Sequence, residues 1–167
     1  EVSFLVSKKQ LGDIIDRCIA IHGTEVTAKV LDRVKAQGFK YSTVGAITVA
    51  VCDALIPPQK GEILAEADTK VGEITRMFNR GLISNTERYN QVIEIWQNTT
   101  EKVSKALEKN LDARNPIFMM ADSGARGSMD QIKQLAGMRG LLANTAGHTI
   151  EMPIRSNYRE GLNILEY

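Results

Sequence analysis

The sequence predicts a mainly α protein with minor β (α+β), in which an antiparallel helical hairpin, or coiled-coil arm, stands on a small mixed body. Three observations support this fold class. Two long stretches in the middle of the chain carry apolar residues at helical spacing, a β-branched run precedes them, and a glycine-rich segment follows them. We therefore expect three parts, formed by residues 1–60, 61–113 and 114–167.

The hairpin of residues 61–113 has the clearest local signals. Gly81 stands where a helix ends at a C′ glycine, and Ser84 to Glu87 has the spacing of a capping box that begins the next helix. The apolar stripes are Ile63, Ala67, Val71, Ile74 and Phe78 in the first helix, and Tyr89, Val92, Ile93, Trp96, Val103 and Leu107 in the second. Their near-heptad spacing predicts two paired helices, about 27 Å long for eighteen residues. The stripes leave open whether the hairpin projects or packs against its own body.

Residues 1–60 contain a helical pattern followed by a β-branched run. Residues 8–38 have apolar positions at helical spacing, with a break at Gly23 and Thr24. The β-branched run within residues 39–56 predicts an extended strand, and Pro57 with Pro58 ends it.

Residues 114–167 contain the glycine-rich segment. Glycines 124 and 127 bracket Arg126, which predicts a tight loop, and Ser128 or Asp130 can cap a short helix over residues 130–136. A loop leading into a helix N-terminus is a place where an anion could bind. Further along we expect a turn at 144–147, a short strand at 149–153 and the start of a helix at 158–167.

Composition limits the function classes. The chain has 167 residues, 43% hydrophobic and 25% charged, and its net charge of +1 gives no indication of nucleic-acid binding.

The motifs that are missing limit the function further. Cys18 and Cys52 form no CxxC pair, which fits free thiols in a reducing cytoplasm. No apolar stretch is long enough for a membrane span. His22 and His148 have no metal-ligand spacing, and no phosphate-loop or dinucleotide motif occurs. Both ends look cut, so we expect a piece of a longer polypeptide.

Five strings carry a family resemblance, in order along almost the whole chain. They are LIPPQK, RYNQVIEIW, MMADSGARGS, QIKQLAGMRGLLA and NYREGLNILEY. Together they closely resemble the largest (β′) subunit of bacterial DNA-directed RNA polymerase. The resemblance is strongest over residues 56–60, 87–96 and 118–167.

The resemblance implies that the hairpin corresponds to the rim helices of the secondary channel, the pore through which nucleotides reach the active site. Transcript-cleavage factors dock on this rim, and the residues that match its tip are Gly81, Leu82, Ile83, Glu87, Tyr89, Asn90 and Glu94. By the same resemblance, Arg126 would face the inner channel near the incoming triphosphate or a cleavage-factor tip. A guanidinium suits this role because it can bind phosphate oxygens in pairs. Its implied neighbours on the channel side are Ser123, Gln131, Lys133 and Arg139. Residues 138–150 resemble the F-loop, which supports the bridge helix and the trigger loop.

The resemblance also implies what this segment leaves to the rest of the enzyme. The family's Asn-Ala-Asp-Phe-Asp-Gly-Asp motif for the catalytic metal is missing, so we expect no catalytic residue, metal or cofactor here and no activity of the segment alone. Mg²⁺ and nucleotidyl transfer belong to the complete enzyme. The implied partners are the β, α, ω and sigma subunits, cleavage factors and, through the whole enzyme, DNA and RNA; no membrane is implied. Gln91 stands where some bacteria have a basic residue that helps bind an alarmone, which puts that site in doubt although Asn90 and Glu94 remain.

Two other functions are compatible with the residues. A stand-alone adaptor would use the hairpin to bind another protein, and would bind it as an isolated chain. An RNA-binding module would use the basic loop and would lose affinity steeply with salt. Against the RNA module, only Tyr158 lies among the basic residues as an aromatic that could stack on a base.

Overall fold

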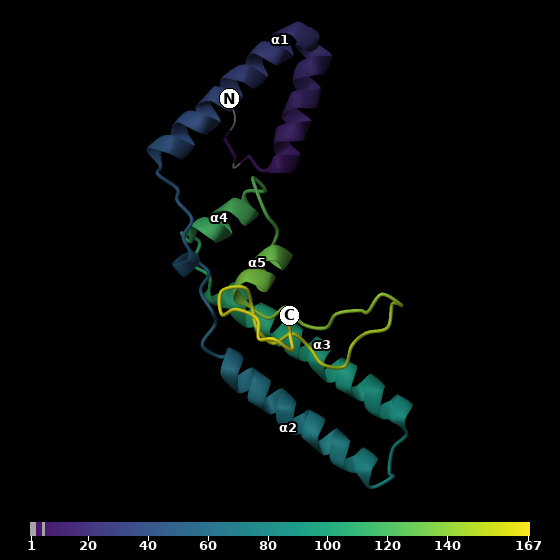
Figure 1. Cartoon of the computed structure of the whole chain (residues 1–167). Coiled ribbons are helices and arrows are strands. Elements are labelled where there is room, and N and C mark those ends of the chain that lie inside the picture. The colour runs from purple at the N-terminus through teal and green to yellow at the C-terminus, as the bar shows by residue number, and fades with distance from the viewer. Residues whose placement is uncertain (1–2, 5) are drawn as a thin grey trace.

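The computed structural model describes residues 3–4 and 6–167; Glu1, Val2 and Leu5 lie outside the described residues. The helices are α1 (Lys8–Val44), α2 (Lys60–Asn79), α3 (Asn85–Asn110), α4 (Pro116–Asp122) and α5 (Met129–Ala136), with a 3₁₀ turn, η1 (Val51–Asp53). Figure 1 shows the α2–α3 hairpin at one end of the molecule, α1 at the other end, and α4 and α5 between them.

The predicted hairpin forms, and its local signals act as expected. Gly81 has φ 74°, and the Ser84 hydroxyl accepts a hydrogen bond from the Glu87 amide at 3.2 Å. The Glu87 carboxylate in turn accepts one from the Ser84 amide at 2.8 Å, which completes the capping box. Between the helices the core contains Ala67, Ile74, Val92, Trp96, Val103 and Met138. The two apolar stripes therefore face each other, as their spacing predicts.

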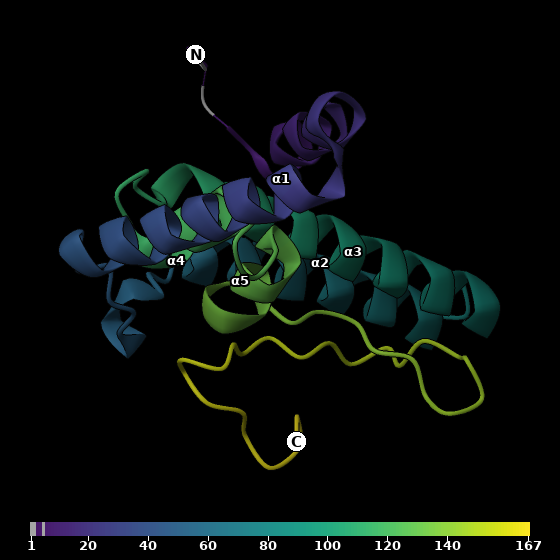
Figure 2. The same cartoon turned by 90° about the horizontal axis from the view of Figure 1, so that it is seen from above.

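The hairpin is lined on one side by the chain that follows α5. This segment runs beside the hairpin in both views (Figures 1 and 2) and brings Met138 into the hairpin core. Close approach is possible at Gly140, because a Cβ there would lie 3.1 Å from the Thr100 hydroxyl of α3. A second core, formed by Ala54, Leu107, Leu111, Ile132 and Ala136, joins the base of α3 to α5.

The expected break at Gly23 is confirmed, and α1 is two helical limbs joined at this residue. Gly23 has φ 77° and ψ 174°, which no helix contains. The Thr27 hydroxyl, which donates to the Gly23 carbonyl at 2.7 Å, also lies 3.5 Å from the Cys18 sulfur of the other limb. Figure 1 shows the resulting bend at the top of the molecule.

The predicted minor β content is wrong for the described residues, which form no strand. Residues 39–44 continue α1, and the β-branched run after them is an exposed linker that leads into η1. β-branched residues suit a pleated surface packed against neighbours, and no neighbouring strand is present here to form one. Of the expected strand at 149–153, the described part of the chain has a single bridge, Ala143 to Thr149, and a second bridge, Gly140 to Ile154, lies just beyond it.

The helix expected to start at 158–167 does not form either. Gly161 has φ 84°, and the side chains of Asn157 and Asn163 accept hydrogen bonds from the amides three residues later, of Glu160 and Glu166. Such local side-chain bonds compete with helix formation. The end of the chain therefore folds into turns.

Candidate functional site

The tip of the hairpin presents a mixture of free and engaged side chains. Leu82 is 68% exposed, and Asn90 and Glu94 are also exposed. Ile83 is half-buried against the hairpin core, while Glu87 holds the helix cap, and its hydrogen bonds with Ser84 lower the pKa of the Glu87 carboxyl. Of the predicted docking residues, Leu82, Asn90 and Glu94 are therefore the ones most available to a partner.

Tyr89, also predicted to dock a partner, lies against another part of the chain. Its hydroxyl donates to the Thr149 carbonyl at 2.9 Å. The preceding residue, Arg88, donates two hydrogen bonds to Glu151, at 2.6 and 2.7 Å. Arg88 and Tyr89 of the RYN string thus hold residues 149–151 against the tip, a role that no local pattern in the sequence indicates.

The glycine-rich loop has the tight shape that the sequence predicts. Gly124 and Gly127 have φ 71° and 88°, and the Arg126 amide donates to the Met120 carbonyl at 3.2 Å, which closes the loop behind α4. A Cβ on Gly124 would lie 3.3 Å from Cβ of Lys8, so this loop also borders the start of α1. Ser123 and Arg126 are both exposed on it.

The other predicted channel residues lie on α5 and just after it. Ser128 caps α5 through its hydroxyl, which accepts from the Gln131 amide at 3.4 Å. Lys133 and Arg139 line an open groove of about 630 Å³ between α3 and α5, and Gln131 lies outside it. Lys133 also pairs with Asp130 at 3.3 Å, and the Arg139 guanidinium lies 5.5 Å from the Tyr158 ring centre.

The predicted site residues therefore fall into three places: the hairpin tip, the groove beside α5 and the loop around Arg126. The tip lies at the N-terminal end of α3, and the groove runs along the C-terminal half of this helix, from Gln97 to Glu108. The loop between α4 and α5 lies beyond the C-terminal end of α3 (Figure 1). Since α3 has 26 residues, these ends are about 39 Å apart. The tip and the basic loop cannot contact one small ligand together.

Two further arginines near the end of the chain have structural partners. Arg155 forms an ion pair with Asp68 of α2 and lies 4.9 Å above the Trp96 ring, and Arg159 donates to the Ala54 carbonyl. Their cations therefore fasten the C-terminal segment to the hairpin and to the second core.

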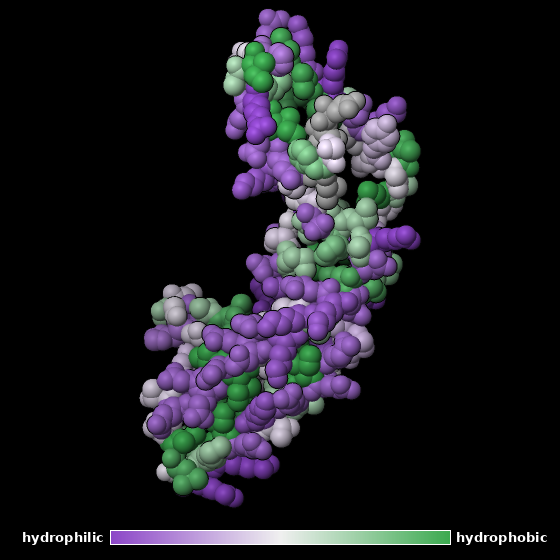
Figure 3. Space-filling model, turned by 180° about the vertical axis from the view of Figure 1, so that it is seen from behind, coloured by the Kyte–Doolittle hydropathy of each residue, from purple (hydrophilic) through white to green (hydrophobic). Residues whose placement is uncertain are grey.

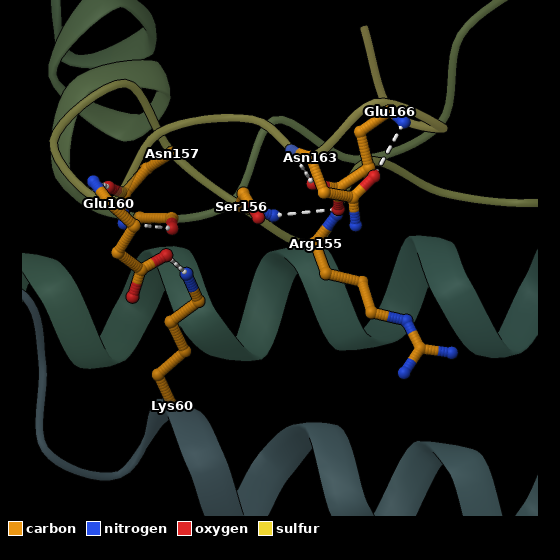
Figure 4. A network of polar contacts seen from close by, with 8 residues as sticks. Lys60, Arg155, Ser156, Asn157, Glu160, Asn163 and Glu166 are labelled. Carbon is orange, nitrogen blue, oxygen red and sulfur yellow. Dashed lines mark hydrogen bonds and ion pairs between the residues drawn. The ribbon is translucent and has the colours of Figure 1, made fainter.

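A polar network that the sequence analysis missed holds the same segment (Figure 4). Glu166 accepts hydrogen bonds from the amides of Arg155 at 2.9 Å and Ser156 at 3.2 Å, and Lys60 pairs with Glu160 at 2.5 Å. Asn157, 1% exposed, donates to the Gly137 carbonyl at 3.0 Å. Burial, the largest single influence, raises the pKa of Glu166, but the hydrogen bonds from Ser156, Asn163 and Arg155 together bring it below its ordinary value.

The described residues, 3–4 and 6–167, contain neither a group of candidate metal ligands nor a candidate membrane-spanning helix. No three His, Cys, Asp or Glu side chains gather as metal ligands would. Within the same residues, none of the helices combines the length and apolar character of a membrane span.

Comparison with known proteins gives a consistent result. Residues 83–159 match the family described as RNA polymerase Rpb1, domain 4. All 167 residues align with proteins named DNA-directed RNA polymerase subunit beta', at 59% identity in Clostridium acetobutylicum and 58% in Caldicellulosiruptor saccharolyticus. The identity is also 59% to the protein of that name from Caldanaerobacter subterraneus subsp. tengcongensis. The chain spans 14% of the length of each of these relatives.

Proposed function

Because the chain belongs to the family of bacterial DNA-directed RNA polymerase β′ subunits, we propose that it forms part of the wall and rim of the secondary channel in the complete enzyme. In this proposal the tip of the α2–α3 hairpin docks transcript-cleavage and regulatory factors. The loop around Arg126 lies beside the path of nucleotides, and residues 138–150 support the bridge helix and trigger loop. The relatives that match the full chain are β′ subunits, so we prefer this role to a stand-alone adaptor or an RNA-binding module.

The observation that carries the proposal is the separation of two exposed features along α3. An apolar and polar tip, with Leu82, Asn90 and Glu94 exposed, lies at one end, and exposed Arg126 lies on a tight loop beyond the other. Protein factors bind through exposed apolar anchors with a polar rim, whereas phosphate oxygens suit a guanidinium. The two surfaces therefore suit two different partners.

The chemistry of the complete enzyme lies outside this segment in our proposal. Nucleotidyl transfer, the Mg²⁺ ions that serve it, and DNA and RNA binding belong to the assembly with the β, α, ω and sigma subunits, in the cytoplasm. The described residues offer no carboxylate cluster that fits a catalytic magnesium ion. The role proposed for this chain is to shape the channel and to position partners, and we expect no activity of the segment alone.

The docking surface is tested by changing Leu82 to Asp in the intact polymerase and titrating a transcript-cleavage factor. An aspartate in place of a 68% exposed leucine removes an apolar contact and adds a charge that a buried interface disfavours. We expect the factor's affinity to fall about tenfold or more while elongation without the factor is unchanged. Glu73→Lys, a charge change at an exposed position on α2 away from the tip, is the control. An unchanged affinity for the Leu82 variant contradicts the proposed docking site.

The nucleotide path is tested by changing Arg126 to Ala in the intact polymerase. Loss of the guanidinium should raise the nucleotide concentration needed for half-maximal elongation, or slow factor-assisted cleavage, by roughly threefold to tenfold, as expected for one charge-assisted contact. Arg114→Ala, at another exposed arginine, controls for loss of surface charge. If both elongation at limiting nucleotide and cleavage are unaffected, Arg126 does not serve the channel.

A further inference from the structure

Arg88 connects two segments that are 63 residues apart in the sequence. Its Nη1 and Nη2 donate to the two carboxylate oxygens of Glu151 at 2.6 and 2.7 Å. Paired hydrogen bonds of this kind fix both the distance and the orientation of the two groups. The side chains of Arg88 and Glu151 are 19% and 38% exposed, so water screens this contact in part.

The guanidinium is itself held in place from the hairpin side. Asn85 accepts hydrogen bonds from Nε and Nη2 of Arg88 at 3.1 and 3.0 Å. The ring of Phe78, from the end of α2, lies 5.4 Å from the guanidinium carbon. Arg88 therefore contacts both helices of the hairpin tip at once, and its direction toward Glu151 is set by them.

The segment at the other end of the contact is a closed loop. The Ile150 amide donates to the Leu142 carbonyl and the Asn144 amide to the His148 carbonyl, both at 2.8 Å. We call residues 142–151 the tip loop. It is fastened to α3 by Glu151 and, two residues earlier, by the carbonyl of Thr149, which accepts from Tyr89 at 2.9 Å.

We propose that Arg88 is a positioning residue that joins the hairpin tip and the tip loop into one unit, so that a protein factor held on the tip also restrains the tip loop. The transmission to a factor rests on the docking role proposed above, whereas the joining of the two segments does not. Arg88 and Tyr89 act in this proposal by holding the loop, and the exposed Leu82, Asn90 and Glu94 contact the factor.

The connection between the hairpin tip and the tip loop is tested in the intact polymerase by swapping the charges of Arg88 and Glu151. The readout is the rate of hydrogen–deuterium exchange at the amides of residues 142–151. Arg88→Glu and Glu151→Arg each place like charges together, so amide exchange in the tip loop should speed up about tenfold. The double variant restores an opposite pair and should return exchange most of the way to the wild-type rate. Arg80→Glu, an exposed cation at the same end of the hairpin, should leave the loop unaffected. Unchanged exchange in both single variants, or no recovery in the double variant, overturns the proposal.

The effect of a bound factor on the tip loop is tested by adding a transcript-cleavage factor to the wild-type polymerase and to the Arg88→Ala variant. In the wild type, the bound factor should slow exchange in the tip loop severalfold. In Arg88→Ala, the factor should still bind, as measured by titration, but the loop should no longer respond. An equal response in both proteins overturns the transmission. If the factor does not bind the wild-type protein, the docking role of the tip is contradicted instead. The variants with swapped charges then test by themselves whether Arg88 connects the tip to the tip loop.

Discussion

The α2–α3 hairpin and α1 are both long helical regions rich in apolar residues, yet the hairpin buries its apolar residues and α1 does not. Trp96, Val103 and Leu107 of α3 are at most 2% exposed. Among the described residues of α1, Thr27 alone is buried. Figure 3 shows hydrophobic surface at the α1 end of the molecule, and some also over the hairpin end, where Phe78 and Leu82 are exposed.

The difference comes from how the apolar residues are arranged around each helix. In α2 and α3 they form stripes that face one another, and each fully buried side chain contributes about 1.5–3 kcal/mol. In the second limb of α1, Val26, Leu31 and Val34 are 38–45% exposed. The hairpin is therefore stabilised within this chain, whereas the stability of α1 depends little on side-chain burial here.

The largest expected effect is that of shortening a core side chain at the base of the hairpin. Leu107→Ala should lower the free energy of unfolding by about 2–5 kcal/mol, because Leu107 is fully buried and the change leaves a cavity. Leu31→Ala, the same change in α1 where Leu31 is 38% exposed, should cost less than about 1 kcal/mol. Urea unfolding, followed by the fluorescence of Trp96 and by far-UV circular dichroism, measures both. Equal losses of unfolding free energy in the two variants would contradict the claim that side-chain burial stabilises the hairpin more than α1.

The features that could be predicted from the sequence are those with local signals. The capping box at Ser84 and Glu87, the ending at Gly81, and the positive φ of Gly124 and Gly127 each depend on a few neighbouring residues. The loop that exposes Arg126 was predicted for the same reason. These features need no knowledge of the rest of the fold.

The features that were not predicted, or were predicted wrongly, are those that distant segments decide. The run within 39–56 has the residues of a strand but no partner to pair with, so it forms a linker. The contacts of Arg88 with Glu151 and of Tyr89 with Thr149 span 63 and 60 residues, and no spacing rule reaches that far. The docking role of Tyr89 comes from the resemblance and stays a prediction, and the structure adds that its hydroxyl is bonded to Thr149 of its own chain.

A smaller effect is expected where the segment after α5 lies against the hairpin. Gly140→Ala combines a positive φ of 85° with a new Cβ 3.1 Å from the Thr100 hydroxyl, so we expect a loss of about 2–3 kcal/mol. Gly147→Ala has nearly the same φ, 84°, but nothing within 4 Å of the new Cβ, so only the backbone strain of about 1 kcal/mol should remain. The difference between the two variants, measured by urea unfolding, isolates the close contact with α3. Equal losses would mean that a Cβ at residue 140 is accommodated against Thr100 without cost, so that the approach of this segment to α3 is not tight.

The smallest expected effect is the change in the free energy of unfolding at acidic pH. It tests whether the polar network around Glu166 adds to the stability of the hairpin region. Burial alone would raise the pKa of Glu166, but the hydrogen bonds it accepts from Ser156, Asn163 and Arg155 bring the folded-state pKa below the ordinary value of 4.5. A carboxyl with a lowered folded-state pKa stabilises the fold above its unfolded pKa and loses that contribution as the pH falls through the folded pKa.

The free energy of unfolding, followed by Trp96 fluorescence, should therefore change little near neutral pH and decrease as the pH falls below 4.5. Glu166→Gln, which still accepts hydrogen bonds but does not titrate, should make that decrease shallower. The difference should persist at roughly 1 M salt, where the screening length is about 3 Å, because direct hydrogen bonds to backbone amides are short enough to escape screening. If Glu166→Gln loses stability with acid as steeply as the wild type, the carboxylate at residue 166 does not hold the C-terminal segment. The ion pairs of Arg155 with Asp68 and of Glu160 with Lys60 then remain as its fastenings to the hairpin.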